Sequence, residues 1–313
     1  MDELRMNETP PPVVAAVDIG SNSVKMTVAR RGPNGGLDEL GGASEPVRLG
    51  AGVDATGRLD DDRVERAIAT LLRFAKEARA LGATRLVGVA TEATRVAANG
   101  PAFLDRVGTE TGWTIRSISG DAEAALSFRG IATETDLRGE VVVADIGGGS
   151  TETVVARDGA ILSATSIPLG SGRLTDRLVP EDPPTAAAIA ACRAAAGERI
   201  AALDLPPATS SRLVVVGGTG EYLLRLVGDA VPATVGVPSI DAALERLGDM
   251  SSDQLAEAIG IPAARARVLP AGVAIIRAFA DRVQPARVEI ARSGIRTGLL
   301  LDALDDAAKD RGD

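Results

Sequence analysis

Hydrophobic and polar residues follow the same order in two separate segments of this chain. Residues 17–30 read VDIGSNSVKMTVAR, and residues 144–157 read ADIGGGSTETVVAR, 127 positions later. Each segment has an apolar run that ends in Asp, a Gly/Ser-rich stretch and a second run rich in β-branched residues, which predicts strand, tight turn and strand. Seven of the fourteen paired positions are identical: Asp18/Asp145, Ile19/Ile146, Gly20/Gly147, Ser23/Ser150, Val28/Val155, Ala29/Ala156 and Arg30/Arg157. The chain is therefore expected to contain two similar halves.

The pattern between and after these segments alternates between helical and strand spacing. In the first half, a predicted helix that ends at Gly82 precedes strands at 85–91 and 113–119 and a helix that begins near Gly120. In the second half, three strands over 141–169 precede an Ala-rich helix, a strand and glycine turn at 212–221, further helices and a last strand–turn–helix unit. Such alternation is typical of an α/β fold.

We predict two similar domains, each a mixed β-sheet flanked by helices, with a cleft between them. The pattern breaks near 130–140, so the predicted divisions are a leader at 1–12, a first domain at 13–132 and a second domain at 133–313. The leader, MDELRMNETPPP, is expected to be disordered and has no apolar signal segment. No apolar run approaches the roughly 18–20 residues that span a bilayer, so no membrane partner is expected.

Composition narrows the available chemistry. The chain has no histidine, which excludes His-based triads, His-ligated zinc and histidine general acids. The formal charge of −9 argues against nucleic-acid binding through overall charge, although it leaves room for an anionic ligand in a local field. Cys192 is the single cysteine and lies in an Ala-rich run, so we expect a small buried helix residue and a reducing, cytoplasmic environment.

The Gly/Ser turns are the strongest chemical pattern in the sequence. Glycines let backbone N–H groups approach phosphate oxygens, and hydroxyl groups add donors. A buried Asp is costly unless it meets a cation, a proton or a donor, and Asp18 and Asp145 at the strand ends suit Mg²⁺ (or Mn²⁺) held with substrate phosphates. A third turn, VVVGGTGE at 214–221, lacks the spacing of a dinucleotide-binding motif and of a Walker motif. The candidate phosphate-binding residues are Ser21, Asn22, Ser23, Gly148, Gly149, Ser150, Thr151, Gly218 and Thr219.

Two further charged residues follow predicted strands. Arg95 stands at the start of a helix, where it is either a surface residue or a guanidinium that forks onto two phosphate oxygens. Glu123 lies in the first turn of the next helix, where it either complements the helix dipole or takes a proton from water at a cleft edge. In a chain without histidine, such a carboxylate is the natural general base.

Taken in order, these segments resemble the exopolyphosphatase/guanosine pentaphosphate phosphohydrolase (Ppx/GppA) family of the actin-like ATPase superfamily. The similarity covers residues 13 to about 302 through AAVDIGSNSVKM, ATEATRVAAN, ISGDAEAALSFRGI, VVVADIGGGSTETVV, SIPLGSGRLTD, VVVGGT, RVLPAGVAII and SGIRTGLL. The resemblance implies two actin-like (ribonuclease H-like) domains, a homodimer and a link to the stringent response.

The resemblance also implies roles for individual residues. Glu123 matches the family's catalytic carboxylate, and Arg95 matches the arginine that contacts the terminal phosphates. Asp145 and Glu152 match acidic residues that position metal and water, and Asp18 completes the expected metal site. The chain departs from the family at Ala122, where a Glu is frequent, and near the C-terminus at Ala291, Ile295 and Thr297.

The function predicted from these observations is that of an exopolyphosphatase, which hydrolyses the terminal phosphoanhydride bond of inorganic polyphosphate and releases orthophosphate. Longer family members carry a C-terminal helical extension that this sequence lacks, so short polyphosphate chains are expected to be favoured. A basic route for the polymer is predicted along Lys25, Arg30, Arg31, Arg48, Arg129, Arg173 and Arg267.

Three other functions stay open. The first is a guanosine pentaphosphate 5′-phosphohydrolase, against which the scarcity of aromatic residues argues, since they make up only 2% of the chain. The second is a non-catalytic sensor of nucleotide or polyphosphate, and the retained set of charged residues argues against it. The third is a sugar or acetate kinase, for which no segment offers an acceptor-specific insertion.

Overall fold

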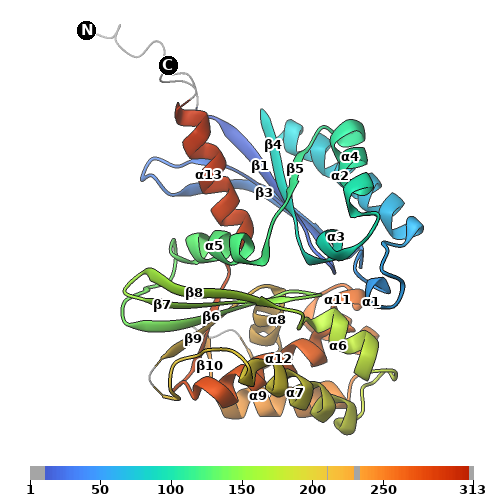
Figure 1. Cartoon of the computed structure of the whole chain (residues 1–313), viewed down its shortest axis with the longest axis vertical. Coiled ribbons are helices and arrows are strands. Elements are labelled where there is room, and N and C mark those ends of the chain that lie inside the picture. The colour runs from blue at the N-terminus through green and yellow to red at the C-terminus, as the bar shows by residue number, and fades with distance from the viewer. Residues whose placement is uncertain (1–10, 210, 229–232, 310–313) are drawn as a thin grey trace, which may run out of the picture.

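Two β-sheets, each flanked by helices, form the described part of the chain (Figure 1). The computed structural model describes residues 11–209, 211–228 and 233–309, so most of the leader predicted at 1–12 lies outside the described residues. The sheets lie one above the other in Figure 1, and the predicted α/β fold with two mixed sheets is confirmed.

The first sheet has the strand order β3-β2-β1-β4-β5. Its central strand β1 pairs antiparallel with β2 and parallel with β4. Successive residues of a strand point to opposite faces, and β1 is apolar on both: Ala15 and Val17 belong to one buried cluster, Val14 and Ala16 to another. The strands are β1 (Val13–Ile19), β2 (Val24–Arg31), β3 (Leu37–Glu45), β4 (Arg85–Ala90) and β5 (Thr114–Ser117).

The second sheet repeats this arrangement and adds one short strand, in the order β10-β11-β9-β6-β7-β8. Central β6 again pairs antiparallel with the next strand along the chain and parallel with β9. Even the bulge recurs: the register shifts between Val28 and Ala29 in the first half and between Val155 and Ala156 in the second. The strands are β6 (Glu140–Ile146), β7 (Thr151–Arg157), β8 (Ala160–Ile167), β9 (Arg212–Val216), β10 (Thr234–Val235) and β11 (Val288–Ala291).

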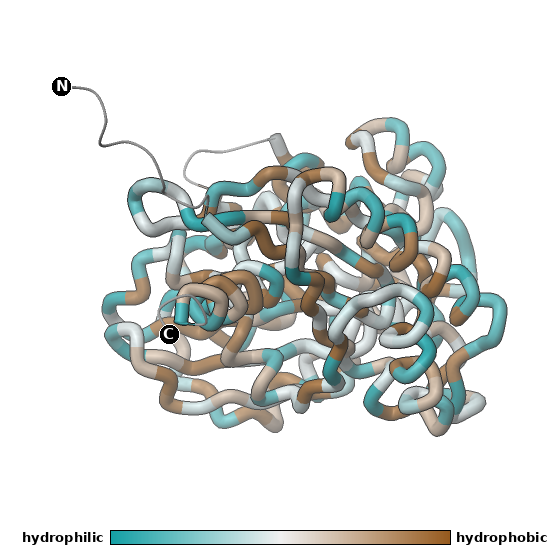
Figure 2. Tube along the Cα trace, turned by 90° about the horizontal axis from the view of Figure 1, so that it is seen from above, coloured by the Kyte–Doolittle hydropathy of each residue, from teal (hydrophilic) through white to brown (hydrophobic). Residues whose placement is uncertain are grey.

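Amphipathic helices cover the sheets, and hydrophobic and hydrophilic stretches alternate along them (Figure 2). The helices are α1 (Val53–Thr56), α2 (Asp61–Ala80), α3 (Glu92–Val96), α4 (Gly100–Thr111), α5 (Gly120–Ile131), α6 (Ser171–Leu178), α7 (Ala186–Ala201), α8 (Gly218–Val227), α9 (Val237–Gly248), α10 (Ser252–Ile259), α11 (Ala263–Ala266), α12 (Leu269–Val283) and α13 (Ile295–Lys309). Among the described residues no single helix is long and apolar enough to cross a membrane, although the bent pair Ser252–Ile259 and Ala263–Val283 reaches that length and composition together.

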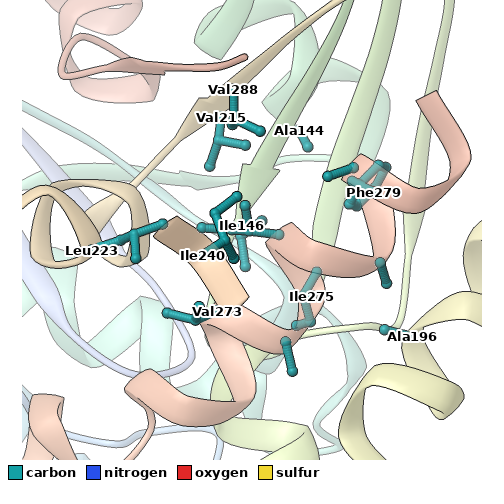
Figure 3. Packing of buried hydrophobic residues seen from close by; sticks show 14 of the residues in the cluster. Ala144, Ile146, Ala196, Val215, Leu223, Ile240, Val273, Ile275, Phe279 and Val288 are labelled. Carbon is teal, nitrogen blue, oxygen red and sulfur yellow. The ribbon is translucent and has the colours of Figure 1, made fainter. Parts of the chain in front are cut away.

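Helix α12 is the centre of the larger hydrophobic core. Its residues Ile275 and Phe279 are fully buried and pack with Ile146 and Val215 of the second sheet (Figure 3). Cys192 belongs to the same core, is fully buried and has a thiol whose pKa is raised by burial to about 11. The expectation of a small buried helix cysteine is therefore confirmed.

The last helix returns to the first half of the molecule. Helix α13 packs against β1 and α5, and its residues Leu299 and Leu300 share a buried cluster with Val14 of the first sheet (Figure 1). The sequence-based division at 133 placed this helix with the second domain, because periodicity identifies the buried face of a helix but not the partner that covers it. Helix α13 is instead part of the layer that covers the first sheet.

The chain thus crosses between the halves twice, after α5 and after β11. One side chain connects the two crossings: the Glu134 carboxylate accepts hydrogen bonds from the backbone N–H groups of Arg292 and Ser293, at 2.5 and 2.7 Å.

Candidate active site

The two Gly/Ser turns have the same backbone closure and touch each other. Gly20 N–H donates to the Ser23 carbonyl at 3.1 Å, and Gly147 N–H donates to the Ser150 carbonyl at 3.0 Å. A Cβ atom added to Gly148 would lie 2.6 Å from the Asn22 Cβ, closer than real contacts allow. The glycines of the second turn therefore make room for the first turn, and the predicted facing arrangement of the turns is present.

A cavity of about 110 Å³ lies where the turns meet. Both turns line it, and so do the third turn and the carboxyl ends of the central strands. The predicted site residues on its wall are Asp18, Ser21, Asn22, Ser23, Glu123, Asp145, Gly148, Gly149, Ser150, Glu152, Gly218 and Thr219. The structure thus brings together residues that lie up to 201 positions apart in the sequence.

Two predicted site residues lie elsewhere. Arg95 stands beside the wall, where its Nη1 donates to the Ile118 carbonyl at 2.7 Å and lies 3.8 Å from Glu123 Oε2. Thr151 has no exposed surface, and its hydroxyl donates to the Leu169 carbonyl. Thr151 is the first residue of β7 and points into the protein, so the structure does not bring its side chain to the cavity.

Glu123 is the base predicted from the sequence, and its environment is unusual for a carboxylate. Its side chain is 11% exposed, and Oε2 has no hydrogen-bond partner among the described residues. Burial raises the pKa of Glu123 to about 10, and the negative charges of Glu152, Asp18 and Asp145 add to the shift, whereas Arg95 opposes it. Helix α5 holds the residue in place, because Ser119 accepts a hydrogen bond from Ala122 N–H at the N-cap.

Three more carboxylates with a raised pKa line the cavity with Glu123. Burial raises the pKa of Glu152 to about 7, with a further rise from Asp145, while a hydrogen bond from Ser166 at 2.7 Å opposes the shift. Burial also raises the pKa of Asp145, against which the hydrogen bond donated by Ser127 acts. The pKa of Asp18 is raised by burial as well, and its Oδ1 has no hydrogen-bond partner in the described residues.

This group fits a hard divalent cation. Asp18 and Asp145 offer carboxylate oxygens from equivalent strand ends, and the buried Asp18 Oδ1 accepts no hydrogen bond from the part of the chain that the structure describes. Within the described ranges no set of three or more His, Cys, Asp or Glu side chains is positioned to hold a metal by itself. Mg²⁺ commonly binds through one or two carboxylates, with substrate phosphates and water as its other ligands.

The cavity is also lined by cationic side chains. Lys25, Arg265 and Arg296 line it together with Tyr222. Burial lowers the pKa of Lys25 to about 8, and the positive charges of Arg265 and Arg296 add to the shift. Arg265 and Arg296 were missed by the sequence analysis, although they lie inside or beside the segments RVLPAGVAII and SGIRTGLL.

The basic route predicted for the polymer is only partly present. Lys25 lines the cavity, and Arg48 and Arg173 line a neighbouring pocket of about 760 Å³. The other four arginines line neither space, so the structure does not bring them to the cleft. Arg30 pairs with Asp38, Arg31 and Arg129 pair with Asp305, and Arg267 donates to the Val179 carbonyl.

Glu92 is a further residue that the sequence analysis missed. It is 7% exposed, and its carboxylate accepts hydrogen bonds from Ser21 Oγ at 3.0 Å and from Arg173. It lies three positions before Arg95 in the segment ATEATRVAAN, and that proximity was the signal available in the sequence.

A model described as the Ppx/GppA phosphatase family matches residues 27–307. The chain belongs to this family. Exopolyphosphatase 1 of Mycobacterium tuberculosis (strain ATCC 25618 / H37Rv) is 29% identical over 306 residues, which cover 94% of this chain and 89% of that protein. Guanosine-5'-triphosphate,3'-diphosphate pyrophosphatase of Vibrio atlanticus (strain LGP32) is 29% identical over 305 residues, 95% of this chain and 60% of its own length.

The fold comparison agrees with this assignment. The crystal structure of the Aquifex aeolicus member of the family superposes with a TM-score of 0.77 at 28% identity, over 95% of this chain and 99% of the other. The predicted family and fold are therefore confirmed, and the membership makes the chain a phosphatase-family enzyme.

Proposed function

We propose that this protein is an exopolyphosphatase, which hydrolyses the terminal phosphoanhydride bond of inorganic polyphosphate and releases orthophosphate. One observation carries the proposal: a buried glutamate, Glu123, with an unpartnered oxygen lies beside Arg95 at the point where two glycine turns converge. A base, a cation for the phosphoryl group and a cradle of backbone amides are the parts that phosphoryl transfer to water requires.

Asp18 and Asp145, with Glu152 beside them, would hold Mg²⁺ or Mn²⁺ in this proposal. When bound, the ion neutralises phosphate oxygens and favours the ionised form of the surrounding carboxylates. Burial raises the pKa of all four carboxylates, and neighbouring negative charges add to the shift for Asp18, Glu123 and Glu152. A bound cation would oppose these shifts.

The side chains of this chain would divide the reaction as follows. The terminal phosphate lies against the two turns, where Ser23 and Ser150 hydroxyls and backbone N–H groups bind its oxygens. Glu123 accepts a proton from a water molecule, whose oxygen forms a bond to the terminal phosphorus as the bond to the bridging oxygen breaks. The shortened polymer leaves with the bonding electron pair, and Arg95 stabilises the charge on the transferred phosphoryl group.

We further propose a preference for short polyphosphate. Only Lys25, Arg48 and Arg173 of the predicted basic route lie at the cleft, since the other four arginines are held by partners away from it. A long polymer would therefore gain little from its distant phosphates.

One observation favours guanosine pentaphosphate as a second candidate substrate. Tyr222, the single tyrosine of the chain, lines the cavity together with the cationic Arg265. A guanine base could stack on its ring there. The scarcity of aromatic residues argued against such recognition, but the one tyrosine lies where it is needed.

Phosphate release with Mg²⁺ would be measured side by side from short polyphosphate, long polyphosphate at equal concentration of chain ends, guanosine pentaphosphate and ATP. The proposal expects fastest release from short polyphosphate. Faster release from guanosine pentaphosphate would favour the second candidate, and binding without any release would favour a non-catalytic sensor. The homodimer stays a prediction from the resemblance, and the cytoplasmic location stays a prediction from the single cysteine.

A further inference from the structure

Glu92 lies between the two phosphate-binding turns and contacts both. It is the first residue of α3 in the first half, and its carboxylate accepts a hydrogen bond from Ser21 Oγ at the tip of the first turn. A Cβ atom added to Gly149 would lie 2.1 Å from Glu92 Oε2, so the carboxylate also packs against the backbone of the second turn.

Arg173, on α6 of the second half, completes this connection. Its Nη2 donates to Glu92, its Nε donates to the Gly149 carbonyl at 2.9 Å, and its Nη1 lies 3.0 Å from Asp54. The guanidinium is thus fixed at three points, and its side chain is 16% exposed. A continuous chain of contacts runs from the first turn through Ser21, Glu92 and Arg173 to the second turn.

These contacts separate two spaces. Ser21, Asn22, Gly148 and Gly149 line both the 110 Å³ cavity and the 760 Å³ pocket on the other side of the turns. Glu92 and Arg173 line the larger pocket alone, directly behind the turn tips. If the turns moved apart, the cavity would open into the larger pocket.

We propose that Glu92 and Arg173 are positioning residues that hold the two turns at the spacing the reaction needs. They act through other groups: the turns that bind the terminal phosphate, and Arg95, which lies one turn along the same short helix as Glu92. The proposal rests on the proposed function for its kinetic consequence, whereas the spacing of the turns is testable without any substrate.

The kinetic test compares Glu92→Gln, Arg173→Ala, Arg173→Lys and the double variant Glu92→Gln/Arg173→Ala. Misplacement of reacting groups by about 1 Å costs about 10²-fold, so kcat should fall by about that factor in Glu92→Gln and Arg173→Ala. The double variant should be no slower than the slower single variant, because both break one unit. Arg173→Lys keeps the charge but cannot reach three acceptors at once. Its kcat should therefore lie between those of the parent protein and Arg173→Ala.

Asp176→Asn is the matched control. Asp176 forms an ion pair with Arg48 across the same cleft, but its side chain touches neither turn, so its kcat should stay within about twofold of the parent, as for surface changes. Losses in the two single variants that multiply in the double variant would overturn the proposal, and so would a normal kcat in both.

A distance measurement tests the same proposal without catalysis. The single cysteine is buried, so Cys192→Ala gives a background for spin labels at exposed Ala55, on α1, and Glu181, just after α6. Arg173→Ala should lengthen or broaden the distance between the labels, and Asp176→Asn should not. An unchanged distribution in Arg173→Ala would overturn the proposal even in an active enzyme. Absence of phosphate release from every substrate, with a changed distance, would reject the proposed function and keep the positioning role.

Discussion

The two turns share one backbone and differ in what they present to the cavity. At the tips, the first turn has Ser21 and Asn22 where the second has Gly148 and Gly149, so one supplies side chains and the other supplies space for them. A glycine-rich turn is commonly explained by the approach of a ligand. Here the closest neighbours of both glycines are residues of the other half of the same protein.

The second difference concerns charge. Lys25 faces Asp18 across the first hairpin, and Glu152 faces Asp145 at the equivalent place in the second. A duplicated hairpin thus carries opposite charges at one position, and acidic and cationic side chains line the same cavity. The carboxylates are suited to activating water and holding a cation, whereas the cationic side chains are suited to binding an anion.

The largest effect on kcat is expected from substitution of Glu123. Glu123→Gln should lower kcat by about 10²–10⁴-fold, because a general base contributes that much, while polyphosphate binding measured by calorimetry should persist. Glu110→Gln, at an exposed glutamate paired with Arg106, is the control and should keep normal turnover. Near-normal turnover in Glu123→Gln would contradict the proposal that Glu123 is the general base.

The metal-free protein should lose stability as the pH rises. Glu152 has a pKa of about 7 in the folded protein against 4.5 ordinarily, so between these values the folded state binds more protons than the unfolded state. Unfolding free energy should fall by on the order of 3 kcal/mol from pH 4.5 to pH 7. Denaturant titrations in a chelator would measure this fall, and Glu152→Gln should reduce it. An equal fall in that variant would contradict the assignment.

The fit between the turn tips should be sensitive to one methyl group. Gly149→Ala would place a Cβ 2.1 Å from Glu92 Oε2, and such overpacking should destabilise the protein by about 1–3 kcal/mol in urea unfolding. Gly108→Ala is the control, because a Cβ there meets nothing within 4 Å inside α4. It should stabilise the protein by about 0.5–1 kcal/mol. Similar effects of both substitutions would mean that the tips do not pack tightly.

The smallest effect is expected from substitution of Lys25, one of the cationic side chains of the cavity. Lys25→Met removes a buried charge that binds the ground state and the transition state alike, so KM should rise by about tenfold with a smaller change in kcat. Initial rates over a range of polyphosphate concentrations would separate the two parameters. A loss confined to kcat would contradict the proposed role of Lys25 in substrate binding.

Much of the fold could be predicted because the relevant information is local. Apolar runs bounded by turn residues located the strands β1, β2, β4 and β6–β8, and the helix expected to begin near Gly120 is α5. The edge strand β3 was not predicted, because its residues LDELGGASE are half-exposed and contain no apolar run. The packing of α13 on the first sheet escaped for a different reason, since its periodicity says nothing about which sheet it meets.

The candidate site divides in the same way. Asp18, Asp145, Glu123 and Glu152 could be predicted, because each lies in a recognisable segment and the cavity gathers them. The roles of Glu92 and Ser127 depend on contacts between residues 81 and 18 positions away in the chain, with Arg173 and Asp145. Such contacts follow from how the halves pack, which no periodicity describes.

The link that Glu134 makes between the two crossings has a mechanical consequence. The two hydrogen bonds to Glu134 join the two connections at one point. Such a link would act as a hinge, which permits rotation of the two halves more easily than sliding. The contact between Glu92 and Arg173 joins α3 to α6, and both helices lie to the right of α5 and α13 in Figure 1. A rotation of the halves about the Glu134 link would therefore change the spacing of the two turns mainly on the side of α3 and α6, where Glu92 and Arg173 connect them.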